Sequence, residues 1–278
     1  MSIMNESELN KLINQLPVLP AVVQRAIEVI DSEDASQGEV ADILTQDPAM
    51  VTQLLGLANS PFYGLAGSVL SIQKACIILG IHTIRSALVA AGAMRAFPVT
   101  SSKFYDRETL WQHALSVGGI AKFIAARLRM DEGSAFTAGL LHDIGKLALD
   151  ECCADRLEEV HSYQQEHDCY DHEAEFAVLG IDHMNLGAKL GQHWNLPAVV
   201  TTTIAGHHGA NLAEENTKLA ALVNLSDVLC HSLQIMHQEN VTVPLLIDNC
   251  LPKLGVTWDQ IRDWLPEIGT LMEQSKLS

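Results

Sequence analysis

His142 and Asp143 stand side by side in an apolar stretch of the sequence, Gly139-Leu140-Leu141-His142-Asp143-Ile144-Gly145-Lys146. We expect this stretch to be a buried helix, in which a charge is costly unless it is paired. Lys146 follows Asp143 by three residues and His142 by four, so one helix would place all three on one surface. A salt bridge between Asp143 and Lys146 is the simplest interpretation, but it leaves the imidazole unexplained.

His113 and His183 also lie where an apolar helix face is expected. Apolar residues follow each of them at helical spacing, so both imidazoles are predicted on the stripe that faces inward. A single histidine on such a face is more often a core residue with one hydrogen bond than a metal ligand. Asp182, immediately before His183, is expected to cap the second of these helices.

His207 and His208 form a pair at the end of a further predicted helix, just before Gly209. At least one of the two imidazoles continues the apolar face of that helix. As cations near a helix C-terminus, both would also be favoured by the helix dipole, which is the alternative interpretation.

Asp227 is the most informative of these residues, because it lies on the apolar face of a predicted helix from about residue 217 to residue 234. No lysine or arginine lies one helical turn away from it. A carboxylate in that place must find a distant partner, be protonated or bind a cation. Only the last of these options also accounts for the histidines.

Imidazoles and carboxylates from separate helices thus collect in one half of the chain. We predict that they form a mono- or dinuclear site for transition-metal ions, with Fe or Mn ahead of Zn or Ni, since mixed nitrogen and oxygen donors suit these ions better than Ca²⁺ or Mg²⁺. The predicted metal ligands are His113, His142, Asp143, His183, His207, His208 and Asp227.

The elements that must position these ligands are predicted to be helices throughout, and the fold class is all-α. Helix-start signals recur, with Ser36 and Glu39 spaced as a capping box, Asp47 before Pro48, and Ser71 ahead of a helix that Gly80 ends. We expect an N-terminal helical lobe in residues 1–100, packed on a metal-binding helical core in residues 101–240. Residues 241–278 are expected to form a loop followed by one or two short helices, because three prolines punctuate them.

The composition limits the classes of partner. The chain has 278 residues, of which 48% are hydrophobic and 18% charged, so a compact structure is expected. A formal charge of -17 argues against nonspecific binding to nucleic acids or anionic membranes. Six scattered cysteines without a CxxC pair indicate reduced thiols, and neither a signal peptide nor a membrane-spanning run is evident, so the cytoplasm is the expected compartment.

The order His113, then His142-Asp143, then a late Asp227 resembles the HD superfamily of metal-dependent phosphohydrolases. The N-terminal half adds motifs that resemble the HDOD branch of that superfamily, whose members are mainly associated with bacterial signalling and often lack the residues for hydrolysis. This resemblance covers roughly residues 16–233, and its N-terminal motifs are Leu16-Pro17-Val18-Leu19-Pro20, Asp47-Pro48, Ala58-Asn59-Ser60 through Tyr63-Gly64, and Leu79-Gly80.

Unlike many HDOD proteins, this chain keeps the ligand residues, and its later histidines are similar to the additional ligands of the HD-GYP phosphodiesterases. The resemblance implies one ion held by His113, His142, Asp143 and Asp227, and a second held by Asp143 with His183, His207 and His208. Two departures separate the chain from HD-GYP proteins. Gly209-Ala210-Asn211 replaces the GYP signature, and Thr109 stands where some members have a metal-binding glutamate.

The resemblance leaves three functions to be distinguished. The first is a regulatory HDOD module with a structural or vestigial metal site, whose partner is another signalling protein. The second is a working phosphohydrolase for a nucleotide or cyclic dinucleotide, in which metal ions activate water, Asp143 bridges them and Lys146 neutralises charge on the phosphate oxygens. The third is a di-iron oxygenase, because some HD-fold enzymes use similar ligands for oxygen chemistry.

Overall fold

The computed structural model describes residues 11, 13, 16–32, 34, 36–59, 69–97, 104–209, 217–233 and 243–275. Within these residues the chain is helical and contains no strand, so the predicted all-α class is confirmed. The motif Ala58-Asn59-Ser60 through Tyr63-Gly64 extends past Asn59 into residues 60–64, which lie outside the described residues.

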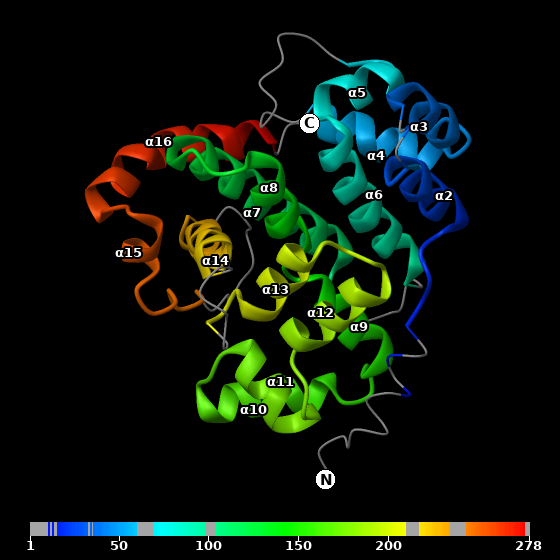
Figure 1. Ribbon diagram of the computed structural model, residues 1–278. Coiled ribbons are helices and arrows are strands. Elements are labelled where there is room, and N and C mark those ends of the chain that lie inside the picture. Colours follow the sequence, from blue (N-terminus) through cyan, green and yellow to red (C-terminus); the bar gives the residue numbers. More distant parts are fainter. Residues whose placement is uncertain are drawn as a thin grey trace.

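The N-terminal helices gather on one side of the molecule (Figure 1). They begin as the sequence predicts: Ser36 Oγ accepts a hydrogen bond from the Glu39 amide, Asp47 accepts two from the start of its helix, and Ser71 accepts one from Lys74. Their bounds are α2 Ala21–Ile30, α3 Gln37–Leu44, α4 Pro48–Ala58, α5 Ile72–Leu79 and α6 Ile81–Ala96.

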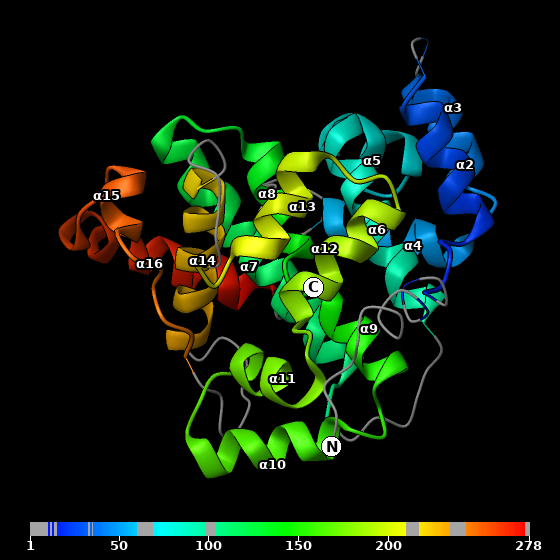
Figure 2. The ribbon, with the colours of Figure 1, turned by 60° about the horizontal axis from the view of Figure 1, so that its bottom comes forward.

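The next series of helices carries the predicted ligands. Its longest member, α7, begins at Arg107 with Asp106 as its N-cap. Both views place α9 and α12 between the N-terminal helices and the α10–α11 pair (Figures 1 and 2). The bounds are α7 Arg107–Leu128, α8 Glu132–Leu141, α9 Ile144–Cys152, α10 Leu157–His167, α11 Asp171–Leu179, α12 His183–His193, α13 Ala198–Gly206 and α14 Thr217–Ser232.

The prediction of a single helix around the His142-Asp143 pair is wrong. Helix α8 ends at Leu141, and α9 starts afresh at Ile144. His142 is the C-cap of α8, where its Nδ1 donates to the Gly139 carbonyl oxygen 2.7 Å away. Asp143 leaves the helical conformation, with φ -98° and ψ 13°. The break turns the two side chains out of a helix face and toward a common centre.

The C-terminal region also differs from the prediction. After the short helix α15, Cys250–Leu254, the chain forms α16, Trp258–Ser275, which has eighteen residues and contains Pro266. Proline is a helix breaker by propensity. Here the apolar face of α16 overrides it, because Ile261, Ile268 and Met272 are buried against the rest of the chain.

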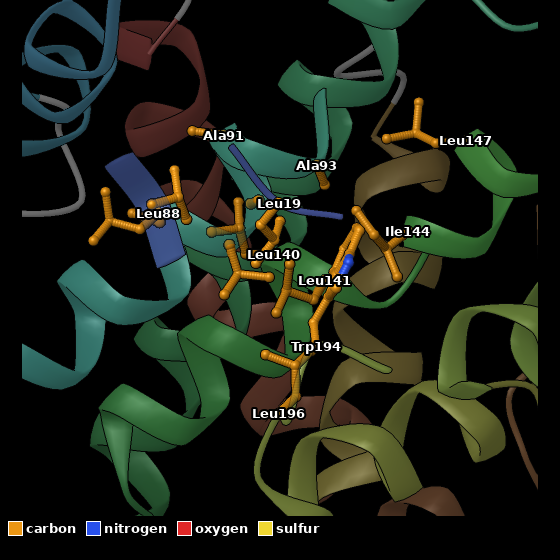
Figure 3. Close-up of a cluster of buried hydrophobic side chains, with 14 of the residues drawn as sticks. Leu19, Leu88, Ala91, Ala93, Leu140, Leu141, Ile144, Leu147, Trp194 and Leu196 are labelled. Atoms are coloured by element: carbon orange, nitrogen blue, oxygen red, sulfur yellow. The ribbon is translucent and has the colours of Figure 1, made fainter. Parts of the chain in front are cut away.

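The N-terminal helices share a hydrophobic core with the ligand-bearing helices. Leu19 and Leu88 lie in the same cluster as Leu140, Leu141 and Trp194 (Figure 3). Polar contacts also join the two sets of helices. The indole Nε1 of Trp194 donates to the Pro17 carbonyl oxygen at 3.1 Å, and the hydroxyl groups of Ser86 and Thr137 form a hydrogen bond of 2.5 Å. The division at residue 100 stays a prediction, since shared packing does not define a domain boundary.

Among the described residues, no single helix is both long and apolar enough to cross a bilayer. Helices α5 and α6 together meet the length and composition criteria, but the chain bends by 114° between them.

Helices α9 and α12 cross at a pair of glycines. A Cβ added to Gly145 would overlap the carbonyl oxygen of His183 and crowd the Gly187 amide, so only glycine permits this approach. Because α9 follows Asp143 and α12 begins at His183, this crossing brings the two candidate ligands together.

We expect Gly145→Ala to lower the free energy of unfolding by about 1–3 kcal/mol, because the added methyl group forces α9 away from α12. Gly56→Ala is the matched control. Gly56 lies in α4, where an added Cβ would meet no other atom within 4 Å, and alanine there should be neutral or stabilising by about 0.5–1 kcal/mol. Urea unfolding of the wild type and the two variants measures both effects. Equal stability of the two variants would contradict the claim that the close approach of α9 and α12 requires glycine at position 145.

Candidate metal centre

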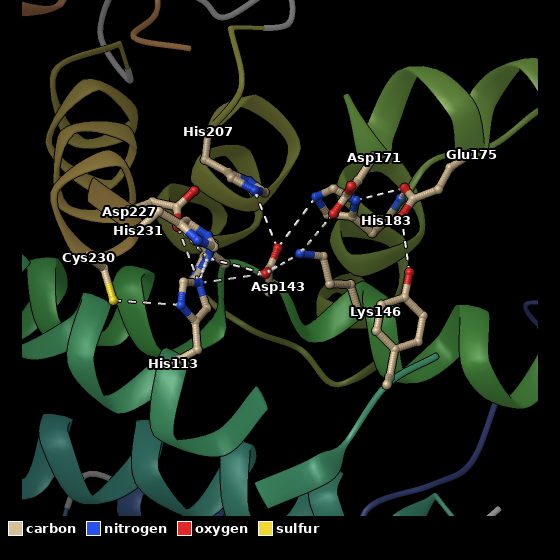
Figure 4. A network of polar contacts seen from close by, with 12 residues as sticks. His113, Asp143, Lys146, Asp171, Glu175, His183, His207, Asp227, Cys230 and His231 are labelled. Atoms are coloured by element: carbon tan, nitrogen blue, oxygen red, sulfur yellow. Dashed lines mark hydrogen bonds and ion pairs between the residues drawn. The ribbon is translucent and has the colours of Figure 1, made fainter. Parts of the chain in front are cut away.

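The seven predicted ligands form one connected cluster, although they come from α7, the α8–α9 break, α12, the end of α13 and α14. Figure 4 shows His113, His183, His207 and Asp227 around Asp143. Three overlapping groups of side chains could each hold an ion, because one ligand atom from each member lies within 4.8 Å of the others. The groups are His113, His142 and Asp227; His142, Asp143 and His207; and His183, His207 and His208.

The first group places two imidazole nitrogens face to face. His113 Nε2 lies 3.3 Å from His142 Nε2, and 3.2 Å from Asp227 Oδ1. The Nδ1 of His142 must carry its hydrogen, because its partner is the Gly139 carbonyl oxygen, which can only accept. In the neutral ring, Nε2 of His142 therefore presents a lone pair to the centre.

The third group has the same polarity, in that its described histidines also direct Nε2 toward the centre. His183 Nδ1 donates to Glu175 Oε2 at 2.7 Å, and His207 Nδ1 donates to the Ile204 carbonyl oxygen at 2.8 Å. Their Nε2 atoms consequently point at Asp143 Oδ1, 3.4 and 3.6 Å away. Lone pairs that face a carboxylate oxygen repel it unless a cation or a proton lies between them.

Asp143 links the first group to the third, because its two oxygens face different ways. Oδ1 faces His183 and His207, whereas Oδ2 lies 3.5 Å from His142 Nε2 and 3.8 Å from His113 Nε2. Lys146 Nζ also lies 2.7 Å from Oδ2, so the predicted salt bridge is present within the wider cluster. A carboxylate in this place is able to bridge two ions.

The protonation states favour cation binding. Burial lowers the pKa of His142 to about 3, despite the nearby carboxylates, and so keeps that imidazole neutral. Burial would raise the pKa of Asp143, but the charge of Lys146 holds it well below its usual range. Burial would likewise raise the pKa of Asp227, and His113 and His231 outweigh it. Two buried carboxylates therefore stay ionised beside a neutral histidine.

A further observation indicates that the predicted ligands fit a metal centre. Buried polar atoms normally have hydrogen-bond partners. Four that face the middle of the cluster have none among the described residues, although imidazole and carboxylate atoms lie 3.2–3.6 Å apart there. They are Asp143 Oδ1, His183 Nε2, His207 Nε2 and Asp227 Oδ1. Nitrogen and oxygen ligands of a transition metal stand about 2.0–2.2 Å from it, hence roughly 3 Å apart when adjacent. Separations of 3.2–3.6 Å between these groups are close to that spacing.

Three supporting residues escaped the sequence analysis. His231 Nε2 lies 3.2 Å from Asp227 Oδ1, and its i,i+4 spacing on one helix was a signal that could have found it. Cys230 Sγ lies 3.7 Å from His113 Nδ1. Glu175 holds His183 from the preceding helix, α11, and no spacing rule marks that contact because a loop intervenes.

A sequence profile of the HDOD domain matches residues 16–210 of the chain. Two relatives show how far that similarity extends. An uncharacterized protein of Treponema pallidum (strain Nichols) is 29% identical over 210 residues, which are 74% of this chain and 40% of that protein. Ribonuclease Y of Lactobacillus acidophilus is 31% identical over 137 residues, 49% of this chain and 19% of the enzyme. The chain thus spans less than half the length of these relatives.

The fold is similar to that of solved bacterial proteins. A crystal structure of an HDOD domain protein of unknown function from Geobacter sulfurreducens superposes with a TM-score of 0.74 and 27% identity, covering 97% of this chain and 96% of the other. A candidate phosphohydrolase from Shewanella amazonensis SB2B has a TM-score of 0.76 at 23% identity, covering 96% and 97%. At that identity the second likeness shows the fold alone.

We expect the purified chain to retain about two equivalents of transition metal after reconstitution with Mn²⁺ or Fe²⁺, and Asp143→Asn to retain less than one, because the amide carries no charge to bridge two ions. Asp171→Asn is the matched control, since that exposed carboxylate lies 3.9 Å from Lys146 Nζ but outside the predicted ligand set. Elemental analysis after desalting measures the metal content. Full loading of Asp143→Asn would contradict the bridging role.

Proposed function

The chain belongs to the HDOD domain family, and on that premise we propose that it is a bacterial signalling protein of the cytoplasm whose metal centre hydrolyses a phosphoester. The observation that supports metal-dependent chemistry is the set of four atoms that face the middle of the ligand cluster and have no hydrogen-bond partner in the described part of the chain. Many HDOD proteins lack such residues, as the family resemblance implies, whereas this chain has all seven in one cluster.

The donor set favours Fe or Mn, with Zn or Ni as further candidates, because imidazole and carboxylate ligands suit these ions. When bound, such ions supply Lewis-acid activation of water and of a phosphoryl oxygen. The protein's own contribution is to fix the ligands. Backbone carbonyls orient His142 and His207 and leave a lone pair on each Nε2, so little rearrangement is required for binding.

Lys146 is the residue that we assign to the phosphate group. Its burial would lower its pKa, but the Asp143 carboxylate raises it above the ordinary value, so the ammonium group stays charged. Once cations share the charge of Asp143, this ammonium group becomes available to phosphate oxygens beside the centre. That local positive charge offsets the acidic balance of the whole chain for an anionic substrate.

The N-terminal helices favour a second role, which is regulation through a protein partner. None of the predicted ligands comes from α2–α6, yet these helices share a core with the ligand-bearing part. A phosphorylated small molecule or nucleotide is therefore the proposed substrate, and a signalling protein is the proposed partner of the N-terminal helices. A structural metal site without hydrolysis is the alternative, and turnover distinguishes the two.

We expect the reconstituted protein to hydrolyse bis-(p-nitrophenyl) phosphate or a cyclic dinucleotide, and Lys146→Met to lower kcat about 100-fold with the metal content unchanged. Lys218→Met, which removes an exposed lysine of α14, is expected to leave kcat unchanged. Initial rates with each metal measure the effect.

Two results would count against the proposal in different ways. Absence of turnover with Fe, Mn, Zn and Ni would leave only the regulatory role. Turnover that survives Lys146→Met at the wild-type rate would retain hydrolysis but remove Lys146 from the mechanism.

A further inference from the structure

Glu175 is a fully buried carboxylate that no predicted role accounts for. Its Oε2 atom accepts two hydrogen bonds from His183, one from the backbone amide and one from Nδ1, both at 2.7 Å. The first of these caps the start of α12, and the second fixes the imidazole ring. Glu175 therefore holds both the backbone and the side chain of one candidate ligand.

The other oxygen of Glu175 reaches a different part of the chain. The hydroxyl of Tyr105 donates to Oε1 at 3.4 Å. Tyr105 lies just before α7, in the stretch that follows the N-terminal helices. Arg107, at the start of α7, donates hydrogen bonds to the carbonyl oxygens of Met94 and Phe97 at the end of α6. A chain of contacts thus runs from the junction of α6 and α7 to His183.

Two candidate metal subsites, one of His113, His142 and Asp227 and one of His183, His207 and His208, share the cluster. They differ in the group that contacts Nδ1 of their histidines. Among the histidines whose Nδ1 contacts the structure describes, His142 and His207 donate to neutral carbonyl oxygens, and His113 contacts the Cys230 thiol at 3.7 Å. Only His183, within that set, has a charged acceptor. A carboxylate acceptor fixes the ring and raises the basicity of the ligand nitrogen more than a carbonyl or thiol does.

We propose that Glu175 is a positioning residue that makes the subsite of His183, His207 and His208 the tighter of two metal subsites, and that Tyr105 couples this subsite to the α6–α7 junction. The proposal rests on the metal centre of the proposed function and goes beyond it, because it ranks the two subsites. It also identifies a route by which a protein partner bound to the N-terminal helices would change the metal occupancy of this subsite and not of the other.

A purely structural role for Glu175 is the alternative, since it also caps α12. Glu175→Gln separates the two roles. The amide oxygen of glutamine still accepts from the His183 amide and from Nδ1, but the negative charge is lost. Glu173→Gln is the matched control on the same helix, where Glu173 accepts from the Tyr170 amide and glutamine serves that capping position equally well.

The test is a titration of the metal-free full chain with Co²⁺, followed by visible absorption against a competing chelator, which resolves two dissociation constants. We expect Glu175→Gln to weaken the tighter step about 10- to 100-fold and to change its absorption bands, with the weaker step changed by less than about threefold. Tyr105→Phe should weaken the same step by less than about tenfold. Asp227→Asn, in the other subsite, should abolish the weaker step, and Glu173→Gln should match the wild type.

An unchanged tighter step in Glu175→Gln, or equal weakening of both steps, would overturn the proposal while two ions still bind. A wild-type protein that takes up no Co²⁺ would overturn the proposed function and this inference together. Circular dichroism of the metal-free variants reports folding. If Glu175→Gln does not fold, Tyr105→Phe decides the question, and a Tyr105→Phe titration identical to the wild type would then overturn the proposal.

Discussion

A buried, ionised carboxylate in the middle of the helical core is the constraint on which the rest of the site depends. Asp143 faces two groups of imidazoles with its two oxygens, and the ammonium group of Lys146 pairs with it. Oδ1 of Asp143 has no hydrogen-bond partner among the described residues, and a buried polar atom without a partner is costly, so cations or protons between the donors would stabilise the arrangement. The histidine tautomers favour metal ions, because backbone acceptors hold hydrogen on the outward nitrogen of His142 and His207.

The surrounding fold meets this constraint by bringing distant segments close together. The break between α8 and α9 frees Asp143 from a helix face, and Gly145 allows α12 to approach within reach of it. The approach sets His183 opposite Asp143, and Glu175 then fixes the ring. Positions that look unrelated in the sequence, such as a glycine and a glutamate, therefore determine the geometry as much as the ligands do.

The sequence predicts the helical fold and the ligand types well, because both leave local signals. Helix starts at Asp47 and Ser71 follow from capping chemistry, and Asp227 is conspicuous as a carboxylate on an apolar face. Features that depend on tertiary packing were missed. Helix α8 ends at Leu141 although the apolar pattern continues past the break, and Pro266 stays within α16 because burial of that helix outweighs local propensity.

The central claim is that Asp143 lies between two metal ions. Diffraction from crystals of the full chain grown with Mn²⁺, measured at a wavelength where manganese scatters anomalously, tests it most directly. The account predicts two anomalous peaks, one beside His113 and Asp227 and one beside His183 and His207, with Asp143 between them. An anomalous map without peaks at these residues, or with one peak that Asp143 does not contact, would contradict the account.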